Sequence, residues 1–167
     1  MIVIIFGVSG SGKTTLSKLL ADELGWRFYE ADDFHSQANF EKMRSGAPLT
    51  DEDRLPWLEK LRELISRCDE SHENAVLACS ALKRVYRERL RVSTEVKFVF
   101  LRGDYALIAK HLCHRRGHFM SPALLRSQFA DLEEPQSDEG VLTTELGRTP
   151  HELVEEIEIK LHLISRN

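Results

Sequence analysis

A glycine-rich loop near the N-terminus, GVSGSGKT at residues 7–14, restricts the possible folds of this chain more than any other stretch. It matches the pattern G-x-x-x-x-G-K-[ST], in which small residues let main-chain N–H groups wrap around phosphate groups. The residues before it, Ile2 to Phe6, form an apolar run typical of a strand buried on both faces of a parallel sheet. After it, leucines recur at helical spacing as far as Gly25, a residue suited to ending a helix. The order strand, loop and helix therefore predicts a phosphate-binding site on an α/β fold.

The loop residues are predicted to bind the phosphates of a nucleotide. Lys13 is expected to reach the β- and γ-phosphates, and the hydroxyl of Thr14 to coordinate Mg²⁺. The N-terminus of the helix that follows adds its own attraction for anions. The predicted nucleotide-binding residues are Gly7, Val8, Ser9, Gly10, Ser11, Gly12, Lys13 and Thr14.

Strands and helices are predicted to alternate along the rest of the chain. Four further strand candidates lie at residues 27–30, 75–79, 97–101 and 141–144, with helical stretches between them. This alternation predicts a five-stranded parallel sheet with helices on both faces. At 167 residues, the chain is most simply one domain, spanning residues 1–167.

Two polar segments do not fit the sheet, residues 32–57 and residues 115–135. Both are rich in arginine or in acidic side chains. In a small kinase, such segments bind the substrate and form a lid that excludes water when it closes. We therefore predict a substrate-binding insertion at about 32–57 and a lid at about 115–135.

The composition disfavours several other classes of protein. The formal net charge is −4, which does not suggest a nucleic-acid-binding surface. No stretch could span a membrane, and the apolar start lacks the preceding basic segment of a signal peptide. The three cysteines are odd in number and widely spaced, so a reducing compartment is the simpler interpretation. These observations predict a cytoplasmic protein with neither a nucleic-acid nor a membrane partner.

Two side chains outside the loop are predicted to take part in phosphoryl transfer. Asp32 lies just past the second predicted strand, at the carboxyl end where open α/β sheets bind ligands. An aspartate there can accept a proton from a substrate hydroxyl or orient that hydroxyl for attack on the γ-phosphate. Arg115, in the predicted lid, can stabilise negative charge on the transferring phosphoryl group.

The third predicted strand ends in a stretch suited to an anionic substrate. Ser80 is a small residue at the turn, where a ligand can approach closely. Lys83 and Arg87 follow, four residues apart and therefore on one helical face. A pair of cations directed into the cleft would bind an anion. No aspartate ends this strand, so Mg²⁺ is expected to rely on Thr14, phosphates and water.

Four blocks of the chain together resemble the gluconokinase family of P-loop small-molecule kinases. They are GVSGSGKTT, YEADDFHSQANFEKMRSGAPLTDEDRLPWL, CSALKRVYRERLR and GHFMSPALLRSQFADLEEP. The first block is shared by many kinases, whereas the other three are specific to this family. The resemblance covers nearly the whole chain. Two positions depart from the family: Glu30 stands where aspartate is common, and His111 replaces an arginine at the start of the lid helix.

The resemblance implies a nucleoside-monophosphate-kinase-like fold, ATP with Mg²⁺ as the donor, gluconate as the acceptor and 6-phosphogluconate as the product. It also implies a homodimer. Gluconate needs cations at its carboxylate, polar groups along its hydroxyls and a carboxylate near the reacting hydroxyl. The predicted contacts are Asp32 at the 6-hydroxyl, the cations Arg54, Lys83 and Arg87, and the polar side chains His35, Ser80 and His118.

Two other functions are compatible with the phosphate loop. A related kinase acting on shikimate or a nucleoside monophosphate would explain the loop and the lid, but not the insertion at 32–57. A nucleotide-dependent switch protein that binds guanine should carry N-K-x-D, and no asparagine of this chain begins that sequence. The sequence therefore favours an enzyme over a switch.

Overall fold

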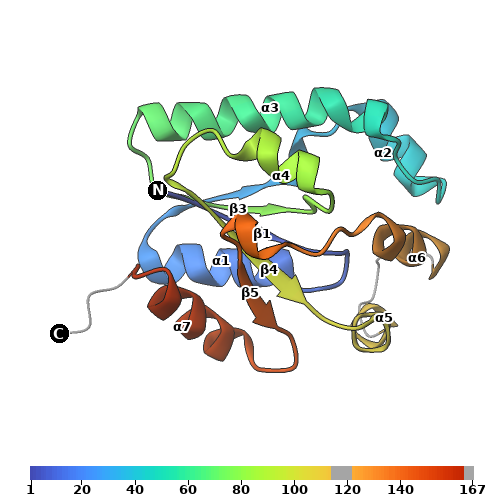
Figure 1. Ribbon diagram of the computed structural model, residues 1–167. Helices are drawn as coiled ribbons and strands as arrows, with labels where there is room; N and C mark the ends of the chain where they lie inside the picture. The colour runs from blue at the N-terminus through green and yellow to red at the C-terminus, as the bar shows by residue number, and fades with distance from the viewer. Residues whose placement is uncertain (114–121, 164–167) are drawn as a thin grey trace.

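Five parallel strands form a single sheet in the computed structural model, which describes residues 1–113 and 122–163 (Figure 1). The strand order across the sheet is β2-β3-β1-β4-β5, so β1 lies at the centre, between β3 and β4. The strands are β1 (Ile2–Phe6), β2 (Arg27–Glu30), β3 (Ala75–Cys79), β4 (Val96–Arg102) and β5 (Leu142–Glu145). The predicted fold class, a five-stranded parallel sheet with helices on both faces, is confirmed.

The strand boundaries differ from the prediction only on one side of the sheet. The first three strands have the predicted bounds, whereas β4 is one residue longer at each end and β5 is shifted by one residue. Pairing between strands explains the difference: Val96 pairs with Ile2 of β1, and Arg102 pairs with Glu145 of β5. Ladder partners from distant parts of the chain therefore set the ends of these strands: β4 begins at the buried Val96 and ends, like β5, at an exposed charged residue.

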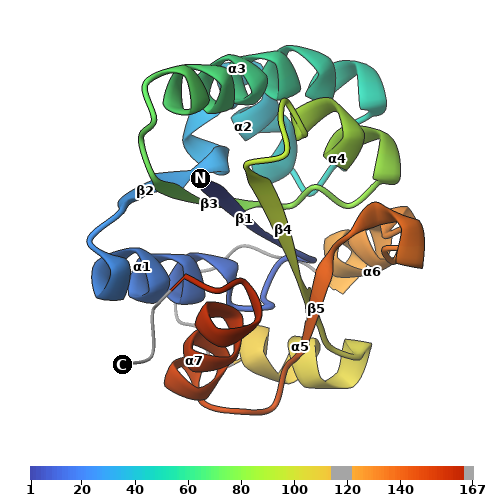
Figure 2. The same cartoon turned by 60° about the vertical axis from the view of Figure 1, so that its left-hand side comes forward.

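Helices cover both faces of the sheet, as Figures 1 and 2 show. One face carries α1 (Lys13–Leu24) and α7 (Pro150–Lys160), and the other carries α3 (Asp51–Glu70) and α4 (Arg84–Leu90). Because successive side chains of a strand point to opposite faces, β1 contributes to both cores. Its Ile2, Ile4 and Phe6 pack in the core that includes α3. Its Val3 and Ile5 pack with α1 and α7.

A third group of elements lies beyond the carboxyl ends of the strands, at the right of Figure 1. It consists of α2 (Gln37–Arg44), α5 (Tyr105–Cys113) and α6 (Pro122–Asp131); the short helices η1 (Ala31–Phe34) and η2 (Ser137–Glu139) complete the fold. A small cluster of Val8, Leu82, Ile108 and Leu125 joins α5 and α6 to the phosphate loop. The predicted insertion contains η1, α2 and the first turns of α3, and the described part of the predicted lid contains α6.

In the described part of the chain, no helix combines the length and the apolar character needed to cross a lipid bilayer.

Glu158 is a buried carboxylate on α7 that is expected to make stability depend on pH. Its residue is 7% exposed, and burial raises its pKa, with the neighbouring charges of Glu23 and Glu155 acting in the same direction. A carboxyl whose pKa is raised by folding stabilises the fold below its unfolded pKa, and this contribution is lost as the pH rises through the folded pKa. Glu158→Gln is therefore expected to raise the melting temperature by about 1–3 °C at pH 8.

The gain from Glu158→Gln should shrink as the pH falls, because protonation neutralises the buried carboxyl of the parent protein. Thermal unfolding at pH 8, 6.5 and 5 measures this trend. Glu70→Gln, at an exposed position near the end of α3, serves as the matched control and should change little at any pH. A gain that is the same at all three pH values would contradict the assignment.

Candidate active site

The phosphate loop joins β1 to α1 in a backbone conformation that glycine permits. Gly10 and Gly12 have φ angles of +82° and +89°, in the left-handed region that other residues rarely adopt. At Gly10 a side chain would also meet Leu112, because an added Cβ would lie 2.6 Å from the Leu112 Cγ. Lys13 folds back over the loop, and its Nζ donates a hydrogen bond of 2.9 Å to the carbonyl oxygen of Val8. The loop thus keeps its main chain close to any bound phosphate.

Oxygen ligands suited to Mg²⁺ meet at the start of α1. The Thr14 hydroxyl donates a hydrogen bond of 2.7 Å to a carboxylate oxygen of Glu30, at the end of β2. Burial raises the pKa of Glu30, while the hydrogen bond from Thr14 opposes the shift. Mg²⁺ prefers such hard oxygen donors, and a hydroxyl that donates its hydrogen to a carboxylate still offers a lone pair to the metal. The donor set therefore fits Mg²⁺.

Asp32 is carried by η1, immediately after β2, and an aromatic side chain holds this segment in place. The indole nitrogen of Trp57, on α3, donates a hydrogen bond of 2.7 Å to the carbonyl oxygen of Ala31. The ring of Trp57 stacks on His35, with ring centroids 4.5 Å apart and an interplanar angle of 11°. Burial lowers the pKa of His35. The charge of Asp32 opposes this shift and that of Arg54 adds to it, and the net shift favours the neutral form of the imidazole.

One cavity of about 260 Å³ connects the loop to these side chains. It brings together Ser9, Lys13, Asp32, His35, Arg54 and Ser80, all of which the sequence predicted as site residues. It is also lined by Glu30, Phe40, Met43, Arg44, Pro48, Leu49, Trp57, Leu124, Ser127 and Gln128. The cavity thus places residues predicted to bind phosphate, a carboxylate and cations around a single space.

Arg54 is a cation of the cavity that is held by several partners. Its side chain is 11% exposed, and its guanidinium group lies 3.3 Å from a carboxylate oxygen of Asp131 and 3.3 Å from the hydroxyl of Tyr86. It also lies over the ring of Tyr86, 5.7 Å from the centroid. A guanidinium held from several sides can bind a carboxylate in a fixed geometry, because its donors form a planar fork.

The comparison with known proteins agrees with this geometry. A model of the shikimate kinase family matches residues 9–145. A gluconokinase of Gluconobacter oxydans is 44% identical over 156 residues, which cover 93% of this chain and 88% of that protein. The chain belongs to the gluconokinase family. This membership makes it an enzyme of the phosphotransferase class and disfavours the switch-protein hypothesis.

Solved structures give the same relationship. A sugar kinase of Janibacter has a TM-score of 0.91 at 43% identity, with 97% of this chain and 94% of that chain covered. A gluconokinase of Sinorhizobium meliloti has a TM-score of 0.82 at 37% identity, with 98% and 97% covered. The nucleoside-monophosphate-kinase-like arrangement of the P-loop kinases is therefore the fold of this gluconokinase-family chain.

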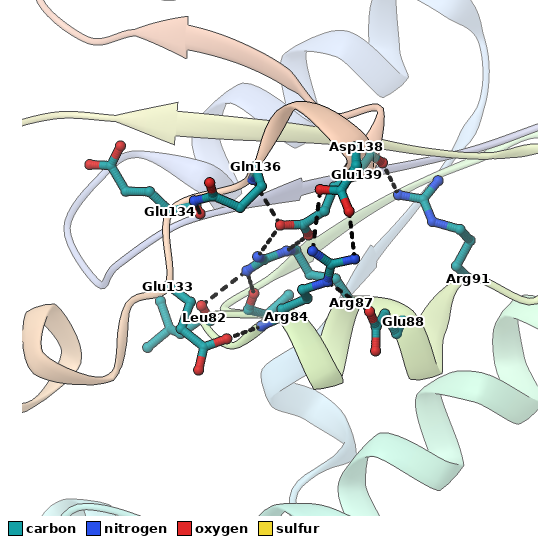
Figure 3. Close-up of polar contacts among 11 residues, drawn as sticks. Leu82, Arg84, Arg87, Glu88, Arg91, Glu133, Glu134, Gln136, Asp138 and Glu139 are labelled. Atoms are coloured by element: carbon teal, nitrogen blue, oxygen red, sulfur yellow. Dashed lines mark hydrogen bonds and ion pairs between the residues drawn. The ribbon is translucent and has the colours of Figure 1, made fainter.

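Two of the predicted substrate cations do not line the cavity. Lys83 precedes α4, and its Nζ lies 2.7 Å from a carboxylate oxygen of Asp51, at the start of α3. Arg87 is 1% exposed and forms a two-pronged ion pair with Glu139, at 2.7 and 2.9 Å (Figure 3). Its remaining nitrogen donates to the carbonyl oxygens of Ala81 and Leu82, at 3.2 and 3.0 Å. The assignment of Arg87 as a substrate contact is therefore replaced by a structural role.

Arg87 supports the turn that carries Ser80. Ala81 has a φ of +38°, an unusual conformation for a residue with a Cβ, and Arg87 binds the carbonyl oxygens on this turn. Around it, Arg84 pairs with Asp138, and Arg91 donates to the main-chain oxygen of Glu139 (Figure 3). This network fixes the chain after β3 to the segment before β5. Two further predicted site residues, Arg115 and His118, lie outside the described residues.

Among the polar residues of the cavity, the sequence analysis missed Arg44 and Gln128. Arg44 lies in the last turn of α2, and within residues 1–113 and 122–163 it forms no ion pair. Gln128 lies on α6, in the block that carries part of the resemblance to gluconokinases. Neither residue belongs to a sequence pattern that would distinguish it from an ordinary solvent-exposed side chain. Their assignment depended on the packing of α2 and α6 around the carboxyl ends of the strands.

Proposed function

We propose that the protein transfers the γ-phosphoryl group of ATP, bound with Mg²⁺, to the 6-hydroxyl of D-gluconate. The products are 6-phospho-D-gluconate and ADP. The observation that carries the proposal is the single cavity in which Lys13 of the phosphate loop, Asp32 and the cations Arg44 and Arg54 share one space. The gluconokinase of Gluconobacter oxydans, 44% identical over 93% of this chain, supports the choice of acceptor.

Each of the polar residues of the cavity has its own role in phosphoryl transfer. As the bond from gluconate O6 to the γ-phosphorus forms, the bond to the oxygen bridging the β-phosphate breaks, and the hydroxyl proton passes to Asp32. Lys13 stabilises the charge on the phosphates through the reaction. Thr14 and Glu30 are the side chains that would hold Mg²⁺. When bound, this ion neutralises negative charge on the phosphate oxygens.

The acceptor is recognised at its carboxylate and along its hydroxyls. Arg54 and Arg44 are positioned to bind the carboxylate, and the neutral ring of His35 and the hydroxyl of Ser80 can exchange hydrogen bonds with hydroxyl groups. A nucleoside monophosphate would need a slot for its base. The aromatic rings of His35 and Trp57 instead stack on each other, and each therefore covers one face of the other.

Lys13→Ala is expected to reduce kcat by about a hundredfold or more, because one positioned charge is lost from an electrostatically stabilised transition state. The measurement is steady-state kinetics with saturating gluconate, alongside thermal unfolding to show that the variant is folded. Lys18→Ala, at an exposed position on the same helix, is the matched control and should retain activity. A folded Lys13→Ala protein with near-normal turnover would refute the role of the phosphate loop.

The test of the acceptor uses compounds that differ in one feature. ADP formation is followed with D-gluconate, with glucose and with glucitol, which has the same chain of hydroxyls but no carboxylate. Gluconate should have a kcat/KM at least about a hundredfold higher, because the other two leave the cations of the cavity without a partner. Equal values for gluconate and glucitol would overturn the proposal. Faster reaction with shikimate or a nucleoside monophosphate would favour the alternative kinase.

We also propose the homodimer that the family resemblance implies and the cytoplasmic location that the composition predicts. The mass in solution, measured by light scattering, should be twice that of one chain. A monomeric mass at micromolar concentration would exclude a stable dimer.

A further inference from the structure

Gln128 links the predicted lid directly to the phosphate loop. Its side-chain carbonyl oxygen accepts a hydrogen bond of 2.6 Å from the main-chain N–H of Ser9, a residue 119 positions away in the sequence. This distance lies just below the usual range for an N–H donor and an oxygen acceptor. The uncharged amide oxygen of Gln128 thus takes up the hydrogen bond of one main-chain N–H in the loop that is predicted to bind phosphate.

The packing of α6 holds Gln128 in position for this hydrogen bond. Leu125, one turn before Gln128, is 2% exposed and packs in the same cluster as Val8, the neighbour of Ser9. At the end of α6, Asp131 pairs with Arg54 at 3.3 Å. The helix is therefore anchored both to the phosphate loop and to the cation of the acceptor cavity. Gln128 lies between these two anchors and lines the cavity itself.

We propose that Gln128 is a substrate-contacting residue that exchanges partners during the reaction. In the structure, its oxygen accepts the hydrogen bond from the Ser9 N–H. When ATP binds, phosphate takes this donor, because a hydrogen bond to a charged oxygen is about twice as strong as one between neutral groups. The released carboxamide then donates its NH₂ group to the transferring phosphoryl group. This inference rests on the proposed kinase function and adds a residue to its machinery.

The exchange predicts opposite effects on nucleotide binding and on turnover. Gln128→Met keeps the length of the side chain but removes a competitor for the Ser9 N–H, so nucleotide should bind about two- to tenfold more tightly. The same change removes a donor to the phosphoryl group, so kcat should fall by about tenfold or more. Gln128→Glu should weaken nucleotide binding by about tenfold, because a charged oxygen holds the N–H more strongly and repels phosphate.

The experiment measures the dissociation constant of a non-hydrolysable ATP analogue with Mg²⁺ by titration calorimetry, without an acceptor, and kcat with gluconate. We expect Gln128→Met to bind the analogue most tightly, the parent protein less tightly and Gln128→Glu most weakly. Ala130→Ser, at an exposed position on α6, is the control and should match the parent protein in both measurements. A residue that only supports the fold would lower the melting temperature and leave nucleotide binding weaker or unchanged in Gln128→Met.

The inference is overturned if Gln128→Met binds the analogue no more tightly than the parent, or if its kcat is unchanged. The affinity order of Gln128→Glu and the parent tests the exchange even if the methionine variant does not fold. Failure of the proposed function has a different signature: the parent protein would bind the analogue but not phosphorylate gluconate. The binding measurements contain no acceptor, so they remain decisive in that case.

Discussion

Arg87→Met is expected to lower the free energy of unfolding by about 3–5 kcal/mol, the range for removing one partner of a buried ion pair. The Arg87 side chain is 1% exposed and that of Glu139 is 5% exposed, so the substitution leaves a carboxylate in a site with little access to water. Burial by itself would raise the pKa of Glu139, but its hydrogen bonds to Arg87 and to the Gln136 N–H hold that pKa below its usual range. Chemical denaturation at pH 7 measures the loss.

Two comparisons separate the buried pair from ordinary surface charge. Arg84→Met removes a neighbouring arginine that pairs with Asp138, but its side chain is 41% exposed, so the loss of stability should be much smaller than for Arg87→Met. Combining Arg87→Met with Glu139→Leu removes both charges, and the double variant should recover much of the lost stability. A loss below about 1 kcal/mol for Arg87→Met alone would contradict its structural role.

Asp32→Asn is expected to reduce kcat by about two to three powers of ten while changing the KM for gluconate by only a few-fold. Asparagine has nearly the same shape and still binds a hydroxyl, but it cannot accept the proton released as the phosphoryl group is transferred. The residue lies on η1, which the Trp57 indole fixes through the carbonyl oxygen of Ala31, so the substitution should not move the segment. Steady-state kinetics in gluconate measures both constants.

The adjacent residue provides the control for this prediction. Asp33 is exposed on the same short helix and does not line the cavity, so Asp33→Asn should keep kcat within a few-fold of the parent. Equal losses at the two positions would indicate a general effect on η1. An Asp32→Asn enzyme with full activity would remove Asp32 from the mechanism.

Most of the fold could be predicted because its signals are local. The apolar run Ile2–Phe6, the glycine loop and the leucines after it identify the first strand, turn and helix from adjacent residues alone. The Thr149 and Glu152 side chains likewise form a capping box at the start of α7, and this motif involves residues only three positions apart. Local signals do not determine the ends of β4 and β5, because these ends depend on pairing between strands far apart in the sequence.

The candidate site was predictable only in part, because several of its residues are defined by distant partners. Asp32 directly follows the carboxyl end of β2. In a parallel sheet this end lies at the same edge as the phosphate loop, so its position was predictable. Arg87, by contrast, is one of several cations in its stretch of sequence. What distinguishes it is its buried ion pair with Glu139, 52 residues away. Arg44 and Gln128 reach the cavity only through the packing of α2 and α6. Local sequence carries no signal for such contacts.

A competition between acceptors tests the central claim most directly. Purified protein is incubated with ATP, Mg²⁺ and equal concentrations of D-gluconate, glucose, shikimate and AMP, and the products are identified by mass spectrometry and ³¹P NMR. Because the product ratio reports the ratio of kcat/KM values, one reaction ranks all four acceptors. The account predicts that nearly all transferred phosphate is found in 6-phosphogluconate, with one ADP formed for each. Phosphorylated shikimate or ADP as the main acceptor product, or ATP consumption without any phosphorylated gluconate, would contradict it.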